Sequence, residues 1–328
     1  MGITATFDGF GAVLRTLEAP DRHGAMANVT LGRPTIAEYK PHNSGHLGAI
    51  AGRFANRIAH ARFTLDGVEY QLTPKHGPHH IHGGPIGFAQ REWTVTTSSP
   101  ERTVMRLVSE DGDQGFPGRV EAEVEYAIVP PGTLRVTFRA TTDKATVINL
   151  TIHAYWNLRG EGEGTIEDHV LQLWAGRYLP TDALSIPTGE LASVDGTPFD
   201  FRTPRRIGER IDADDAQIRI GKGYDHCFVI DRPSVNDKAL RLCARVLEPE
   251  SGRVVEVATT EPGVQFYTAN GMSGIVGTSG REYQSRSGFC LETQHFPNSP
   301  NEPSFPSTVL RPGEAFHSVT EFRFSVET

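Results

Sequence analysis

The chain has 328 residues, 38% of them hydrophobic and 22% charged, which is the composition of a globular protein with ample length for a large core. Its formal net charge is −8, from 32 Lys and Arg against 40 Asp and Glu, so nucleic acid is not an expected partner. It contains no apolar stretch of about 18 residues, so no membrane-spanning helix is expected.

The N-terminal segment and the cysteines bear on the compartment. Residues Met1 to Pro20 lack a basic segment followed by an apolar one, which argues against a secretory signal. Cys227, Cys243 and Cys290 are widely spaced and odd in number, and they match neither a disulfide framework nor a zinc spacing. We therefore expect reduced, mostly buried thiols in a cytoplasmic protein.

Strand-like alternation dominates the chain. Phe63 and Leu65 lead to Asp-Gly at 66–67 and an alternating run over 68–72, which predicts a hairpin with a two-residue turn. A longer hairpin is predicted over 120–128 and 134–140, with Glu on one wet face opposite Arg on the other. Alternation returns at 322–326.

Helical signals are few. Residues 205–214 could form a short helix, whereas 237–247 fits either period and is interpreted as a strand because a turn-rich segment and a β-branched run follow it. No fixed-period repeat or linker appears. Many short strands joined by polar turns indicate two large packed sheets or a barrel, whose concave face would form a groove.

Several histidines occur close together, and they raise the possibility of a metal site. His76, His79, His80 and His82 could supply imidazole ligands, and His80 and His82 would share one face of a strand. The next acidic residue, Glu92, lies beyond a proline and a glycine, which fits a metal site poorly. A polar loop with one useful histidine is the simpler interpretation.

Other ionisable residues lie among apolar and aromatic neighbours. His153 stands in an aromatic stretch, and Glu292 would share a strand face with Cys290. A carboxylate on an inward face is costly unless it is paired, for example with Arg57, or functional. Asp225 could equally be a turn residue. The residues alone indicate an all-β protein with a polar groove and possible acid–base chemistry.

These segments, in this order, resemble the aldose 1-epimerase (galactose mutarotase) family over roughly Gly11 to Ser325. The matching strings are GRFANRI at 52–58, IHGG at 81–84, HAYWNL at 153–158, PTGEL at 187–191, GTPFDF at 196–201, GYDH at 223–226, PGVQFYT at 262–268 and LETQHFP at 291–297. Each string is modest by itself, but their common order is highly specific.

The resemblance implies a β-supersandwich, a single domain over 1–328 with two large, curved, mostly antiparallel sheets, and no metal or organic cofactor. It implies interconversion of the α and β anomers of free aldoses. Glu292 matches the family's general base and His153 its general acid. The implied substrate-binding residues are Arg57, Asn56, His82, Asp225 and Gln265.

Anomerisation needs a base that takes the proton of the C1 hydroxyl and an acid that protonates the ring oxygen. We expect Glu292 to be ionised and His153 protonated, with Asp225 or Glu292 helping to keep the imidazole charged. Gly83 and Gly84 would let the backbone approach the ligand.

The chain departs from the family pattern at Ile152, at Trp156, in the stretch 34–46 and in the extra histidines at 76, 79 and 80. Because 34–46 could rim the groove, the preferred sugar stays open. Two alternatives also stay open: a hexose 6-phosphate enzyme, which would need further basic residues among Arg53, Arg202, Arg205 and Arg206, and a non-catalytic sugar-binding protein. A free monosaccharide is the expected partner, and the chain is expected to be a monomer or weak homodimer.

Overall fold

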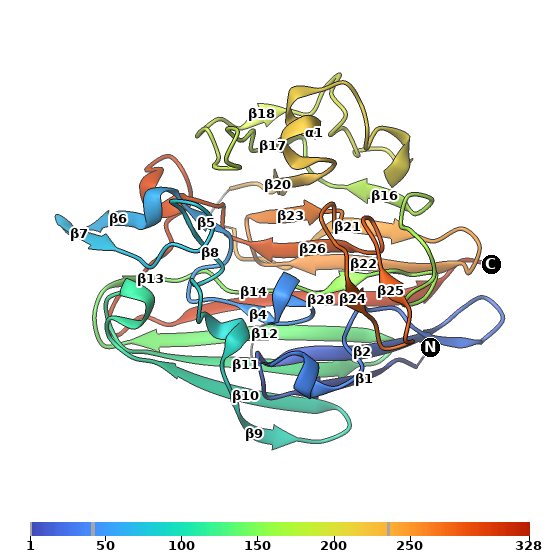
Figure 1. Cartoon of the computed structure of the whole chain (residues 1–328), viewed down its shortest axis with the longest axis horizontal. Helices are drawn as coiled ribbons and strands as arrows, with labels where there is room; N and C mark the ends of the chain where they lie inside the picture. The colour runs from blue at the N-terminus through green and yellow to red at the C-terminus, as the bar shows by residue number, and fades with distance from the viewer. Residues whose placement is uncertain (1, 41–42, 235–236) are drawn as a thin grey trace.

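The computed structural model describes residues 2–40, 43–234 and 237–328. Strands dominate it, and two large antiparallel sheets, one of nine strands and one of six, form the body of the molecule (Figure 1). The predicted fold class, an all-β supersandwich, is confirmed. The main core contains buried apolar residues from Ile3 to Phe324, drawn from both large sheets. Across the described residues, no helix has both the length and the apolar character that crossing a membrane requires.

The nine-stranded sheet contains the longest strands. In sheet order they are β19 (Arg205–Arg206), β16 (Val170–Leu173), β21 (Arg241–Leu247), β22 (Arg253–Thr259), β28 (Phe316–Val326), β12 (Thr133–Thr142), β11 (Val120–Val129), β10 (Arg102–Ser109) and β9 (Thr94–Ser98). The predicted hairpin is β11 and β12, and Glu123 lies opposite Arg139 with 3.2 Å between carboxylate and guanidinium. Alternating side chains therefore bury one face of the hairpin and pair charges on the other.

The six-stranded sheet carries part of the predicted site. In sheet order its strands are β15 (Tyr155–Trp156), β26 (Phe289–Gln294), β23 (Gly263–Tyr267), β20 (Asp225–Val229), β17 (Arg177–Tyr178) and β18 (Ala192–Ser193). On β26, Leu291 belongs to the main core while every residue of the strand is buried. Both faces of this strand are thus covered, so the odd and even positions of the strand serve different layers.

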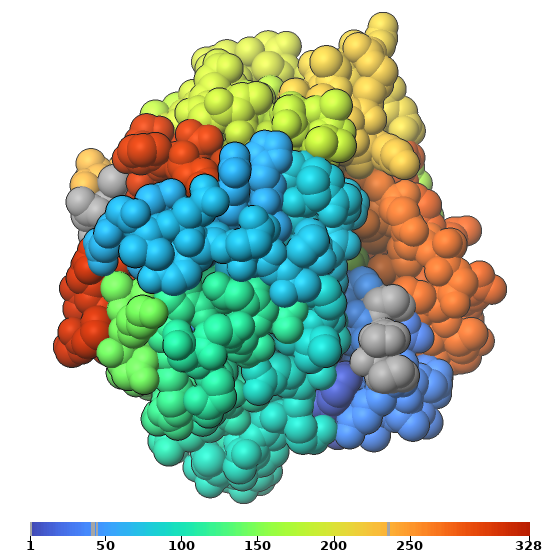
Figure 2. Space-filling view, turned by 60° about the vertical axis from the view of Figure 1, so that its left-hand side comes forward, coloured from blue at the N-terminus to red at the C-terminus, as the bar shows by residue number. Residues whose placement is uncertain are grey.

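The remaining strands form smaller sheets. They are β1 (Thr4–Asp8), β2 (Val13–Pro20) and β3 (Met26–Asn28), and the pairs β4 (Ile50–Ala51) with β14 (Thr151–Ile152), β5 (Arg57–Ile58) with β8 (His80–Ile81), β6 (Arg62–Leu65) with β7 (Val68–Gln71), β13 (Thr146–Val147) with β27 (Val309–Leu310), and β24 (Ile275–Val276) with β25 (Glu282–Tyr283). The segment containing β5 to β8 forms a continuous block, coloured blue to cyan in Figure 2. The predicted β6–β7 hairpin is confirmed, with φ of 51° at Asp66 and 79° at Gly67, as a two-residue turn requires.

Helical segments are short. They are the 3₁₀ turns η1 (Ile36–Glu38), η2 (Ser44–His46), η3 (Ala59–Ala61), η4 (Phe88–Gln90), η5 (Asp113–Gly115), η6 (Ile207–Glu209) and η7 (Ser299–Asn301), and the helix α1 (Ala216–Gly221). The helix predicted over 205–214 is wrong, because Arg205 and Arg206 pair with β16. The helix begins later because the Asp215 side chain accepts hydrogen bonds from the amides of Gln217 and Ile218. The strand interpretation of 237–247 is correct over Arg241–Leu247.

Candidate active site

A pocket of about 210 Å³ contains every residue that the sequence nominated for chemistry or sugar binding. Its lining residues are Gly45, His46, Asn56, Arg57, Ile81, His82, His153, Tyr155, Asp225, Gln265, Tyr267 and Glu292. A larger cavity, of about 520 Å³ around His295 and Thr308, contains none of the nominated residues. Convergence of ionisable side chains, rather than volume, therefore identifies the candidate site.

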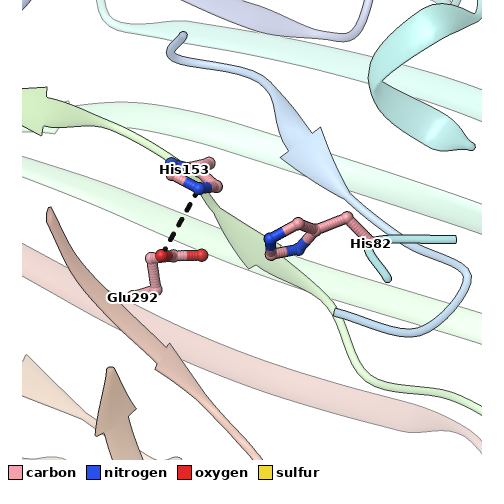
Figure 3. A group of neighbouring side chains, drawn as sticks. All are labelled: His82, His153 and Glu292. Atoms are coloured by element: carbon pink, nitrogen blue, oxygen red, sulfur yellow. Dashed lines mark ion pairs between the residues drawn. The ribbon is translucent and has the colours of Figure 1, made fainter. Parts of the chain in front are cut away.

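His153 and Glu292 form the centre of the pocket. His153 follows β14, and Glu292 lies in the middle of β26; their side chains point toward one another (Figure 3). His153 Nε2 is 3.5 Å from Glu292 Oε1, and the residues are only 5% and 2% exposed. Cys290 Sγ lies 3.5 Å from the other imidazole nitrogen, Nδ1, so Cys290 and Glu292 share a strand face as predicted. The imidazole is held between the two side chains.

Burial governs the proton affinities of this pair. It lowers the pKa of His153 to about 4, although the charge of Asp225 opposes that shift. Burial also raises the pKa of Glu292 well above its usual value; Asp225 adds to the rise and Arg57 opposes it. The expectation that nearby carboxylates keep His153 charged is therefore wrong for the free pocket, because desolvation outweighs their attraction. Burial therefore disfavours charge on both residues of the free pair.

His82 is held in a single tautomer by the backbone of the β5 segment. The amide N–H of Asn56 donates to His82 Nδ1 at 3.1 Å, so the neutral ring carries its hydrogen on Nε2. The prediction that His80 and His82 share a strand face is wrong. β8 ends at Ile81, and His82 has a φ of 49°, which turns its ring into the pocket. His80 instead places Nδ1 2.8 Å from the carbonyl oxygen of Thr73.

Arg57, Asp225 and Gln265 form the polar wall beside the acid–base pair. Gln265 Nε2 donates to Asp225 Oδ1 at 2.7 Å, and an Arg57 guanidinium nitrogen lies 3.8 Å from Asp225 Oδ2. The possible ion pair between Arg57 and Glu292 is thus replaced by one with Asp225. Gln265 lies opposite Glu292 in the β23–β26 register. Glu292 Oε2 and Gln265 Oε1 have no hydrogen-bond partner within the described chain, so both are available to a ligand.

Residues that sequence reasoning missed also line this pocket: Gly45, His46, Ile81, Tyr155 and Tyr267. Tyr155 and Tyr267 stand two positions after His153 and Gln265, so the period of a strand could have found them. His46 was anticipated only as part of the stretch 34–46 that could rim the groove; its ring centroid lies 4.8 Å from that of His82. Within the stretch 34–46, it is Gly45 and His46 that reach the pocket; Pro41 and His42 lie outside the described residues.

A metal ion fits this donor set poorly. Ligand atoms of His82, His153 and Glu292 lie within 4.8 Å of one another. Because His82 Nδ1 already accepts the Asn56 amide hydrogen, Nε2 bears a proton and offers no lone pair to a metal. The other histidines of the sequence cluster do not join the group: His79 Nδ1 accepts the amide hydrogen of His60, and none of His76, His79 and His80 lines the pocket.

Apart from Arg57, the basic residues that could have held a phosphate lie outside the pocket. Arg53 is 2% exposed, and its guanidinium donates to the carbonyl oxygens of Pro117 and Gly118 at 2.9 and 2.8 Å. The remaining candidate arginines, Arg202, Arg205 and Arg206, are paired with Asp200, Glu209 and Asp168 respectively and do not line the pocket. This arrangement disfavours a sugar-phosphate substrate.

Gly83 and Gly84 are not among the residues that line the pocket, and their approach to a ligand stays a prediction. Gly83 has a φ of +81°, and a Cβ there would lie 1.7 Å from the carbonyl oxygen of Gly52. It instead lets the loop after β8 pack against the segment that carries Asn56 and Arg57.

Comparisons with known proteins match the chain over nearly its whole length. The sequence model of the family described as aldose 1-epimerase matches residues 1–323. Galactose mutarotase of Sus scrofa is 43% identical over 318 residues, which cover 97% of this chain and 90% of that protein. Aldose 1-epimerase of Escherichia coli is 38% identical over 328 residues, covering 99% and 93% of the two chains.

Solved structures are similar over the whole chain. The aldose epimerase homologue of C. elegans superposes with a TM-score of 0.91 at 31% identity, covering 100% of this chain and 97% of that one. Galactose 1-epimerase of Lactobacillus acidophilus gives a TM-score of 0.84 at 27% identity, covering 100% and 92%.

Proposed function

The chain belongs to the aldose 1-epimerase family, and we propose on that premise that it interconverts the α and β anomers of free aldoses such as galactose or glucose. The observation that supports this most is the buried His153–Glu292 pair at the centre of the pocket, 3.5 Å apart. Anomerisation needs one group that removes a proton and one that supplies it, and this pair offers both.

In the proposed reaction, Glu292 removes the proton from the C1 hydroxyl and His153 protonates the ring oxygen. The C1–O5 bond breaks, the aldehyde forms, and rotation about the C1–C2 bond presents its other face. The reverse proton transfers then close the ring as the opposite anomer. Each positioned group contributes about 10²–10⁴-fold to such a reaction.

One proton shared by the pair is enough for a full cycle. In the free pocket it resides on Glu292, since burial favours both neutral forms. Sugar hydroxyls that donate to Glu292 favour its ionised form, and the proton then moves to His153. Ring opening returns the pair to the neutral forms that burial favours. The buried site therefore stabilises the ring-opened stage relative to the charge-separated pair.

The polar wall would hold the sugar in place. His82 Nε2–H is a fixed donor, and Arg57 is a permanently charged donor held against Asp225. Asp225 and the free Gln265 Oε1 are acceptors for sugar hydroxyls, and Asn56 fixes His82 through its backbone. Tyr155 and Tyr267 supply flat apolar surface for the sugar's C–H bonds.

We also propose that residues 1–328 fold as a single domain, because one core includes residues from near both ends of the chain. A cytoplasmic monomer or weak homodimer that needs no cofactor remains our proposal for the protein in the cell. The buried, unpaired state of Cys227, Cys243 and Cys290 is consistent with a reducing compartment.

Polarimetry tests the proposed function directly. Freshly dissolved α-D-glucose or α-D-galactose is mixed with chelator-treated protein, and the optical rotation is followed to equilibrium. We expect a faster approach to the same final rotation. No acceleration with these sugars or with xylose and arabinose would overturn the proposal, and equilibrium binding of galactose without acceleration would identify a sugar-binding protein.

A further inference from the structure

Lys75 and His46 form a contact at the edge of the pocket that the acid–base reaction does not use. Lys75 Nζ lies 3.0 Å from His46 Nε2. His46 ends η2 and lines the pocket, whereas Lys75 lies in the loop before β8 and does not line it. The lysine therefore contacts a residue that lines the pocket without lining the pocket itself.

The chemistry of this contact sets the hydrogen on His46. A charged ammonium group has donors and no acceptor, so His46 Nε2 must accept and the ring must carry its hydrogen on Nδ1. His46 is also held neutral, because burial lowers its pKa well below the usual value and the charges of Lys75 and His153 lower it further. The neutral ring therefore offers an N–H donor at Nδ1.

Stacking fixes the orientation of the same ring. The His46 and His153 rings stack at 5.7 Å between centroids with 18° between planes, and His153 stacks on Tyr155 at 4.9 Å and 24°. His82 contacts His46 from another side. The His46 imidazole is therefore held by three neighbours, and its freedom to turn is small.

We propose that Lys75 is a positioning residue that holds His46 in the Nδ1–H tautomer, and that His46 donates this hydrogen to a hydroxyl of the bound sugar. The inference rests on the proposed function and extends it by a specificity-determining residue. An aldose that lacks this hydroxyl, or carries it in the other configuration, leaves the His46 N–H without an acceptor and binds more weakly.

The contact also makes sugar binding depend on pH. Burial lowers the pKa of Lys75 to about 8. Once Lys75 is neutral it can accept a hydrogen bond, so His46 can carry its hydrogen on Nε2 and present a bare Nδ1 to the sugar. The titratable groups around the pair are His80, His82 and His153, whose pKa values the Lys75 charge lowers. Beyond His46, the pocket presents Arg57, Asp225 and Glu292.

The first experiment separates KM from kcat. Polarimetry with galactose at pH 7 compares the wild type with Lys75→Met, which removes the donor, and Lys75→Arg, which keeps it. Loss of one hydrogen bond raises KM by about 3- to 10-fold in Lys75→Met. The change falls in KM rather than kcat, and His46→Phe, which keeps a stacked ring without a donor, raises KM similarly. In the wild type, KM rises above pH 8; in Lys75→Arg, KM stays flat.

The second experiment identifies the hydroxyl. KM is measured for galactose and its 2-, 3-, 4- and 6-deoxy derivatives, and one of them should show the same KM in the wild type and in Lys75→Met. An equal KM ratio across all five sugars, or an unchanged KM for galactose, would overturn the inference. If the wild type is active, these outcomes overturn only the role of Lys75 and His46, and the proposed function stands. If the wild type is inactive, the proposed function itself is overturned.

Discussion

Replacing Glu292 by glutamine should separate activity from stability. The change keeps the shape of the side chain and removes the proposed base. Asp225 cannot replace that base, since it is bound to Gln265 and paired with Arg57. We expect kcat to fall by about 10²–10⁴-fold, equivalent to about 3–5 kcal/mol in the activation barrier.

The same substitution should not lower stability. Because burial raises the pKa of Glu292, the folded chain binds the proton more tightly than the unfolded chain, and ionised Glu292 destabilises the fold increasingly as pH rises above the usual glutamate pKa. Glutamine carries no charge to desolvate. The Tm at pH 7 should therefore equal or exceed that of the wild type.

Glu261, which lies in the connection between β22 and β23, provides a matched control. It is also 2% exposed, but its carboxylate lies 2.6 Å from His295 Nδ1 and it does not line the pocket. Burial, the largest single influence, raises its pKa, but the charge and hydrogen bond of His295 and the hydrogen bond of Ser318 together lower the pKa below its usual value. Its ionised form thus contributes stability at neutral pH that is lost as pH falls through the lowered pKa.

The two glutamines should therefore behave in opposite ways. Glu261→Gln should lower the free energy of unfolding by about 1.5–3 kcal/mol. Polarimetry and thermal unfolding of the purified variants measure both quantities. A wild-type kcat in Glu292→Gln would refute the assignment of the base. If the Tm of Glu292→Gln falls as much as that of Glu261→Gln, the lost activity would instead result from misfolding.

Three further results are expected. As the pH falls, kcat/KM should decrease around pH 4, where His153 is protonated and the pair holds two protons. A decrease near the usual histidine pKa would contradict a pair that shares one proton. Circular dichroism at each pH checks that the fold persists. Arg53→Met should lower the free energy of unfolding by at least about 3 kcal/mol, because it leaves buried carbonyl oxygens without a hydrogen-bond donor. An unchanged denaturant-unfolding curve would show that those contacts are dispensable. Gly83→Ala should destabilise by about 2–5 kcal/mol from backbone strain and overlap with Gly52, whereas Gly67→Ala, at an open turn, should cost less in the same assay.

Local patterns determined much of the fold. The β11–β12 and β6–β7 hairpins follow from alternation and turn residues, because successive side chains of a strand face opposite sides. The helix near residue 216 was misplaced by sequence reasoning because pairing of Arg205 and Arg206 with β16 overrides their local preference. The nominated site residues could be listed from motifs whose order spans the chain.

The tertiary structure alone decided what those residues can do. Burial, which no local pattern reports, makes His153 neutral in the free pocket and raises the pKa of Glu292. The tautomer of His82 depends on the Asn56 amide, 26 positions away in sequence, and that of His46 on Lys75, 29 positions away. Proton affinity and hydrogen-bond polarity depend on contacts between distant segments, so they appear only when the chain is folded.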